Sequence, residues 1–160
     1  MGLLAVKDPA SIQTALPGNV QHPTEVGFGE RIMLLGYNQE LSAGDLQLTL
    51  YWQAEQPLNP NWTVFVHLVD DKGTLKSQHD SQPRDGHYPT SIWDQGEVVG
   101  DQHQLPLPDG LADGTYRVVV GLYSTESGER LPTLDKEGNP TGDSAPLLTL
   151  TLAGGKWQVP

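Results

Sequence analysis

The aromatic and polar residues that could bind a ligand are concentrated in residues 80–96. This segment has neither the alternation of a strand nor the spacing of an amphipathic helix, and a loop this long in a compact domain is usually functional or disordered. Because Pro83 and Pro89 restrict its backbone, we expect it to be ordered. Its candidate ligand-binding residues are Asp80, Arg84, His87, Tyr88, Trp93 and Asp94.

These residue types are the ones a sugar site needs. An aromatic ring covers the C–H face of a pyranose, while polar groups bond its hydroxyls. Tyr88 and Trp93, placed among charged neighbours, therefore indicate a glycan-binding loop. In the alternative interpretation, Trp93 folds back as a plug over the open end of the domain. The Gly96-Glu97 pair that follows Trp93 fits this second interpretation well, and we favour the plug as the role of Trp93.

Metal ligands do not occur at any recognised spacing. None of the five histidines forms H-x-x-x-H or H-E-x-x-H. His67 and His103 fall on strand faces that burial could bring together, but core histidines bonded to backbone are the simpler interpretation. Carboxylates in turns suit a hard cation, so the weak calcium candidates are Asp70, Asp71 and Asp101. Since Asp is also an ordinary turn residue, we expect no cofactor, with a structural calcium ion as the alternative.

Catalytic motifs are also absent from the sequence. There is no G-x-S-x-G elbow and no Gly-rich phosphate loop. His79, Asp80 and Ser81 are adjacent, but neighbours on an extended chain point in different directions, which argues against a working triad. No pair of carboxylates stands out as a glycosidase pair. The sequence therefore predicts a protein that is not an enzyme.

Composition excludes several partners. The chain has 160 residues and a net charge of −11, from 9 Lys and Arg against 20 Asp and Glu. A nucleic-acid binder needs a basic surface, so we expect no nucleic-acid partner. No apolar run approaches the roughly 18 residues of a membrane span, so we expect no direct insertion into a membrane. Cysteine is absent, which excludes zinc fingers and disulfide scaffolds.

The remaining pattern is that of short strands and turns. Residues 46–53 and 115–123 alternate apolar and polar side chains, and 62–69 are apolar on both faces, as in a covered central strand. Further strands are predicted at 31–37, 75–79, 97–105 and 147–152, with a short one at 129–131. The fold class is therefore all-β: a single antiparallel β-sandwich, Ig-like or jelly-roll with Greek-key connections, of about seven or eight strands.

Two local features refine this organisation. The run LADGTY (111–116) has the spacing of a tyrosine corner, in which the hydroxyl of a strand-initial Tyr bonds back to upstream backbone; a plain buried Tyr in an ordinary turn is the alternative. Prolines and glycines at both ends predict a linker or flexible segment over 1–24, the sandwich over 25–153 and a C-terminal tail over 154–160.

A series of motifs in this order resembles a known kind of domain. The motifs are LLGY (34–37), YWQA (51–54), TVFVHL (63–68), YPTSIW (88–93) with GE (96–97), GTYRVVVGLY (114–123) and GERL (128–131). Over about residues 25–152 the chain resembles the C-terminal extracytoplasmic β-sandwich domain appended to bacterial membrane glycosyltransferases of the dolichyl-phosphate-mannose type and to related membrane proteins of unassigned function. The resemblance implies an extracytoplasmic location, periplasmic or at the cell surface, as part of a longer membrane protein. It carries no catalytic residues.

These observations together predict a non-catalytic extracytoplasmic accessory module. Its expected partner is a glycan or a neighbouring membrane protein domain. The alternative is a purely structural spacer or a protein–protein interaction domain.

Overall fold

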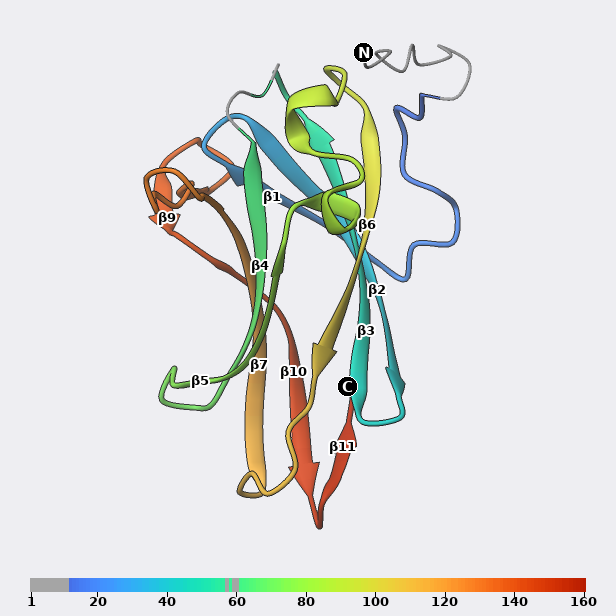
Figure 1. The fold of residues 1–160 in the computed structure, drawn as a ribbon, viewed down its shortest axis with the longest axis vertical. Coiled ribbons are helices and arrows are strands. Elements are labelled where there is room, and N and C mark those ends of the chain that lie inside the picture. Colours follow the sequence, from blue (N-terminus) through green and yellow to red (C-terminus); the bar gives the residue numbers. More distant parts are fainter. Residues whose placement is uncertain (1–11, 57, 59–60) are drawn as a thin grey trace.

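The computed structural model describes residues 12–56, 58 and 61–160. In these residues two antiparallel sheets face each other as a sandwich (Figure 1). One sheet has six strands in the order β6 (Val98–Pro106), β3 (Asp45–Ala54), β2 (Ile32–Ser42), β1 (His22–Phe28), β8 (Thr133–Leu134) and β9 (Pro140–Gly142). The other has five in the order β11 (Lys156–Gln158), β10 (Ala145–Ala153), β7 (Gly114–Ser124), β4 (Trp62–Val69) and β5 (Leu75–Ser81). The predicted fold class is confirmed.

The core lies between the sheets and follows the alternation read from the sequence. On β3, Leu46, Leu48, Leu50 and Trp52 are buried, while Gln47 and Thr49 on the opposite face are half-exposed. Val64, Val66 and Leu68 of β4 and Val118, Val120 and Leu122 of β7 supply the facing layer. The inner face of each sheet is thereby removed from water, which is the main term that stabilises such a fold.

Strand β4 is buried on its outer face as well. The ring of Phe65 lies against Gly121, where an added Cβ would come within 2.3 Å of the ring. The guanidinium of Arg130 covers the same ring, with its Cζ 4.3 Å from the ring centroid. β4 pairs with β5 on one side and β7 on the other, so the predicted central, covered strand is confirmed.

The strand count was predicted too low. The described residues form eleven strands, and four of them were missed: β1, β8, β9 and β11. β1 contains Pro23 and shows no clean alternation, while the other three have only two or three residues, too few for a period to be visible. The strand predicted at 129–131 is reduced to an isolated bridge between Tyr123 and Arg130.

Two of these missed strands begin inside segments assigned to the ends of the chain. β1 starts at His22, within the predicted linker, because its backbone pairs with β2 from His22 to Phe28. β11, which lies inside the predicted tail, forms a hairpin with β10. Its Trp157 packs edge-on against Tyr116, with ring centroids 5.1 Å apart. Residues 1–11 of the predicted linker lie outside the described residues.

The tyrosine corner is confirmed. The Tyr116 hydroxyl donates to the Ala112 carbonyl over 2.5 Å, and its side chain is buried. This bond ties the β6–β7 connection to the start of β7. Among the residues that the structure describes, no helix is long and apolar enough to cross a membrane.

Candidate functional site

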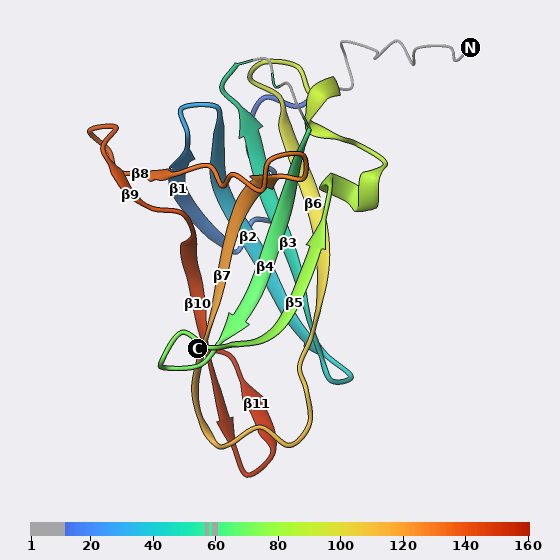
Figure 2. The same cartoon turned by 60° about the vertical axis from the view of Figure 1, so that its left-hand side comes forward.

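Residues 80–96 are more ordered than a structureless loop. The segment leaves β5 at Ser81, forms two short 3₁₀ turns, η2 (Pro83–Gly86) and η3 (Thr90–Ile92), and enters β6 of the opposite sheet (Figure 2, yellow-green). The buried hydroxyl of Thr90 accepts a hydrogen bond from the Trp62 backbone N–H over 3.0 Å. The Ser91 N–H donates to the Asn61 side chain over 2.9 Å. The segment therefore closes one side of the sandwich as a fixed element.

Trp93 is the plug that the sequence favoured. Its side chain is 5% exposed and belongs to the hydrophobic core, and its indole N–H donates to the Tyr88 carbonyl over 2.9 Å. The indole is consequently unavailable as a stacking surface for a sugar.

Tyr88 is half-buried beside this plug. Its hydroxyl donates to Glu97 Oε2 over 2.6 Å, and Glu97 Oε1 accepts the Asp94 N–H over 2.9 Å. The Arg84 guanidinium lies over the Tyr88 ring, with Cζ 5.1 Å from its centroid. Glu97 therefore holds Tyr88 and the backbone of Asp94 in place, and Arg84 packs on the Tyr88 ring.

The turn at Arg84 and Asp85 has unusual backbone geometry. Their φ angles are 54° and 53°, in the left-handed region, which for residues other than glycine costs about 1–3 kcal/mol each. Two contacts hold Arg84 in place: its backbone N–H donates to Asp101 Oδ1 over 2.7 Å, and its Nε donates to the Gly100 carbonyl over 2.8 Å. A strained turn held by a buried carboxylate is a feature typical of binding sites.

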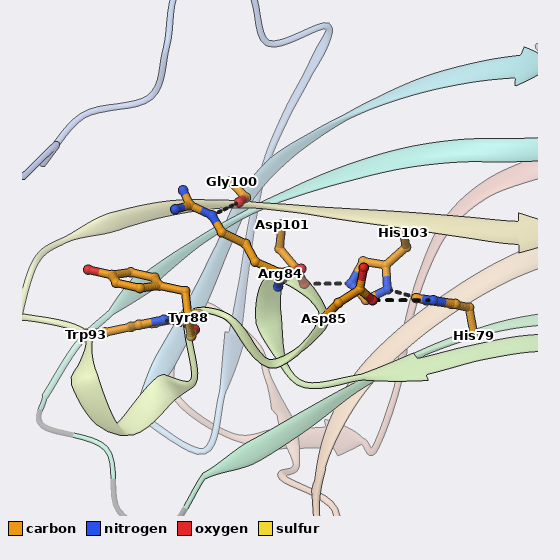
Figure 3. Close-up of polar contacts among 8 residues, drawn as sticks. All are labelled: His79, Arg84, Asp85, Tyr88, Trp93, Gly100, Asp101 and His103. Carbon is orange, nitrogen blue, oxygen red and sulfur yellow. Dashed lines mark hydrogen bonds and ion pairs between the residues drawn. The ribbon is translucent and has the colours of Figure 1, made fainter. Parts of the chain in front are cut away.

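Behind this turn lies a chain of polar side chains, drawn in Figure 3. Asp101 and His103, on the inward face of β6, are 0% and 2% exposed. Asp101 Oδ2 lies 2.6 Å from His103 Nε2, and His103 Nδ1 lies 2.8 Å from Nδ1 of His79 on β5. His79 Nε2 lies 4.0 Å from Asp85 Oδ1, which returns the chain to the turn. Burial and the neighbouring His103 lower the pKa of His79 below its usual value, against the opposing effect of Asp85, Asp101 and Asp80.

The pairing of histidines differs from the one considered from sequence. His103 meets His79, not His67, because β5 and β6 are the edge strands that face each other across one side of the sandwich. His67 instead lies 3.6 Å from Asp80 on the outer face of the five-stranded sheet, where the Tyr123 hydroxyl also donates to Asp80. The adjacent residues His79 and Asp80 thus point to opposite faces of β5, as expected for neighbours on a strand, and do not form a triad with Ser81.

The predicted site residues therefore separate. Asp80 lies on the outer face of the other sheet, away from the turn, and the side chains of His87 and Asp94 are exposed.

The calcium candidates are not brought together either. Asp70 Oδ1 accepts the N–H groups of Lys72 and Thr74 inside the β4–β5 hairpin, and both Asp101 oxygens are engaged in the polar chain. Asp71 is exposed. The described residues contain no group of three or more His, Cys, Asp or Glu side chains that could hold a metal ion.

The structure adds a groove that sequence reasoning missed. Three hollows of about 370, 500 and 450 Å³ adjoin one another on the outer face of β3 and β6. The first two share Thr49 and Gln102, and the second and third share Tyr51, Arg84 and Gly100. Their other polar lining includes Gln21, Asn38, Gln39, Gln47, Tyr88 and Glu97. We call this surface the β3–β6 groove.

Tyr51 forms the middle of the β3–β6 groove. Its ring lies over Gly100, where an added Cβ would come within 3.3 Å of the Tyr51 Cε1. Gly100 thus leaves room for the ring, and its carbonyl accepts a hydrogen bond from Arg84 Nε. In the sequence, this surface corresponds to the polar positions of the alternating strands. Those positions were expected to face water and were not recognised as one continuous surface.

An antiparallel β-sandwich with a polar groove on the outer face of one sheet is the class of protein that these features define. Among solved structures, the chain is similar to one described as "Crystal structure of the C-terminal domain of wzt", with a TM-score of 0.56 and 14% sequence identity over 86% of this chain and 83% of that chain. At this identity the likeness establishes the fold. No family model matches the chain, and no curated protein matches it.

Proposed function

We propose that this domain is a non-catalytic accessory module that binds glycan in the β3–β6 groove. The observation that carries the proposal is the groove itself: three adjoining hollows whose polar lining consists mainly of side-chain amides, a threonine hydroxyl and tyrosines. Neutral donors and acceptors of this kind match the hydroxyls of a sugar, and a row of hollows suits a linear chain better than a compact small molecule.

The charges of the groove narrow the ligand class. Arg84 is the one basic side chain among its described lining residues, against Glu40, Asp85 and Glu97. The chain as a whole carries −11. A polyanion would be repelled by this field, so we expect a neutral or weakly charged oligosaccharide.

The carboxylates near the groove support binding without catalysis. Glu97 already accepts hydrogen bonds from the Tyr88 hydroxyl and the Asp94 N–H, and Asp101 is fully buried behind the turn. A glycosidase needs two carboxyl groups facing each other across the bond to be cleaved. These two residues are committed to holding the segment 84–97 in place.

The location of the module is part of the proposal. The resemblance to domains appended to membrane glycosyltransferases supports an extracytoplasmic module in a longer membrane protein, where it would hold a glycan near a neighbouring membrane domain. A second candidate is a protein–protein interaction domain, which the 45% exposed Leu75 on edge strand β5 favours. Sedimentation of the isolated chain over a range of concentrations tests self-association through that edge.

A glycan array of microbial polysaccharides, followed by calorimetry with a trisaccharide unit of the strongest hit, tests the binding function. The groove variant is Thr49→Ala with Gln102→Ala, because both residues line the junction of two hollows. The matched control is Thr149→Ala with Thr151→Ala on exposed positions of β10. We expect at least tenfold weaker binding in the groove variant and unchanged binding in the control. Absence of binding to every saccharide at millimolar concentration would refute the proposal.

A further inference from the structure

The polar chain behind the β3–β6 groove forms a closed circuit with the strained turn. It runs from the Arg84 N–H to Asp101, from Asp101 to His103, from His103 to His79, and from His79 to the Asp85 carboxylate (Figure 3). We call Asp101, His103 and His79 the histidine relay. Both residues of the strained turn are therefore attached to the same set of titratable side chains.

Packing alone does not account for the relay. Val99 and Leu105, the neighbouring inward positions on β6, are apolar and fully buried. A buried polar or ionic pair contributes little stability compared with apolar side chains of similar volume. Such groups are retained where they provide specificity or a switch, which directs attention to their protons.

The proton count of the relay is limited by one contact. Asp101 accepts from His103 Nε2, so in the neutral pair His103 Nδ1 is the acceptor and His79 Nδ1 is the donor over 2.8 Å. A first added proton goes to His79 Nε2, which faces Asp85. A second would place N–H groups on both Nδ1 atoms, which cannot remain 2.8 Å apart. Double protonation must therefore separate the two rings.

We propose that the histidine relay positions the Arg84–Asp85 turn and makes the β3–β6 groove pH-dependent. At neutral pH the relay holds Asp101 against the Arg84 N–H, which keeps the guanidinium between Gly100 and Tyr88. In acid the two imidazoles separate, and the displaced His103, whose charged ring still donates to Asp101, draws that carboxylate away from the Arg84 N–H. The turn then relaxes from its strained backbone. Two of the three hollows lose their shared wall at Arg84. The effect on ligand binding rests on the proposed function, whereas the effect on the turn does not.

The surrounding groups set the direction of the response. The residues paired with the relay in the adjacent strands, Leu48 for His103 and Val66 for His79, are apolar. The charged groups that act on His79 are His103 and Asp101 on β6, Asp85 in the turn and Asp80 on β5. Since the pKa of His79 is lowered from 6.5, the transition is expected below that pH.

Nuclear magnetic resonance of the whole chain between pH 8 and 4.5 tests the relay without any ligand. The probes are the Arg84 amide and the imidazole nitrogens. We expect the Arg84 amide, which donates to a carboxylate at neutral pH, to shift at a lower pH than the midpoint of His79. The first proton, on His79 Nε2, leaves the contact between the two Nδ1 atoms intact, and only the second separates the rings. In His79→Gln this shift should be lost, because the amide oxygen of the substituted side chain can accept from a protonated His103. His87→Gln, a matched change at an exposed histidine of the same segment, should retain it.

Two outcomes would overturn the relay: an Arg84 amide that stays constant down to pH 4.5, or an unchanged shift in His79→Gln. A second measurement concerns binding, with the trisaccharide that binds best at pH 7.5 as the probe. We expect its affinity to fall at least tenfold at pH 5.0 in the original chain and in His87→Gln, but less than threefold in His79→Gln. Equal affinity at both pH values in the original chain would overturn the effect on the groove. If no saccharide binds, the proposed function fails and the amide titration alone decides the relay.

Discussion

Replacing Asp101 by Asn is expected to destabilise the fold by about 3 kcal/mol at pH 7.5. Asp101 is fully buried, and its two oxygens accept from the Arg84 N–H over 2.7 Å and from His103 Nε2 over 2.6 Å. Asn has the same shape but only one acceptor oxygen, so its amide group must face one of the two donors. The variant replaces two hydrogen bonds to a charged acceptor, each worth about 1.5–3 kcal/mol, by bonds to a neutral amide, each worth about 0.5–1.5 kcal/mol. Its NH2 group can face His103 Nε2 only if His103 and His79 exchange tautomers. A loss of about 1–1.5 kcal/mol for each bond gives about 3 kcal/mol in total.

Urea unfolding followed by tryptophan fluorescence measures this loss as a lower midpoint with an unchanged slope. The exposed Asp109→Asn is the control for a change of charge, and its effect should stay within about 0.5 kcal/mol. A loss below about 1 kcal/mol in Asp101→Asn would refute the reasoning, because it would mean that the buried carboxylate is not holding both donors.

A double variant sharpens the same test. Asp101→Leu with His103→Leu removes both polar groups instead of leaving a weakened polar pair buried. Apolar replacement of a buried pair is often neutral or stabilising, so we expect this variant to be more stable than Asp101→Asn although it removes more hydrogen bonds. The opposite order would show that the relay contributes stability directly.

Three further outcomes are expected. First, because burial lowers the pKa of both His79 and His67, the unfolded chain takes up protons more readily than the folded one. The free energy of unfolding should therefore be constant above pH 6.5 and fall as the pH drops below it. Urea titration at pH 7.5, 6.0 and 5.0 should show a shallower fall in His79→Gln. A stability that rises on acidification would contradict this sign. Second, Tyr116→Phe should remove the hydrogen bond to Ala112 and cost about 1 kcal/mol of stability, or about 2–4 °C in Tm. Tyr123→Phe, which loses only a partly exposed contact to Asp80, should cost less. Equal losses in the two variants would argue against the tyrosine corner. Third, since the oxygens of Asp70 and Asp101 are already engaged, Tm should be the same in 1 mM calcium and in chelator; a rise with calcium would reveal a cation site that these contacts do not show.

The candidate site was only partly accessible from sequence. The sequence singled out segment 80–96 as the candidate ligand-binding segment, which stays a prediction, and favoured Trp93 as a plug, which its burial confirms. The remaining members came from elsewhere: Tyr51, Thr49 and Gln102 lie on β3 and β6, and their relation to Arg84 depends on where segment 80–96 crosses between the sheets. Asp101, considered for calcium, holds a turn instead.

What the sequence determined by itself is the local architecture. Alternation with a period of two is a property of a single strand, so β3, β7 and β10 and their buried faces follow from neighbouring residues, and with them the all-β class. The short strands, the meeting of His79 with His103, and the β3–β6 groove were decided by the tertiary structure. Each requires residues from different strands to be adjacent, and strand order and register depend on the packing of the whole sandwich, not on any one segment.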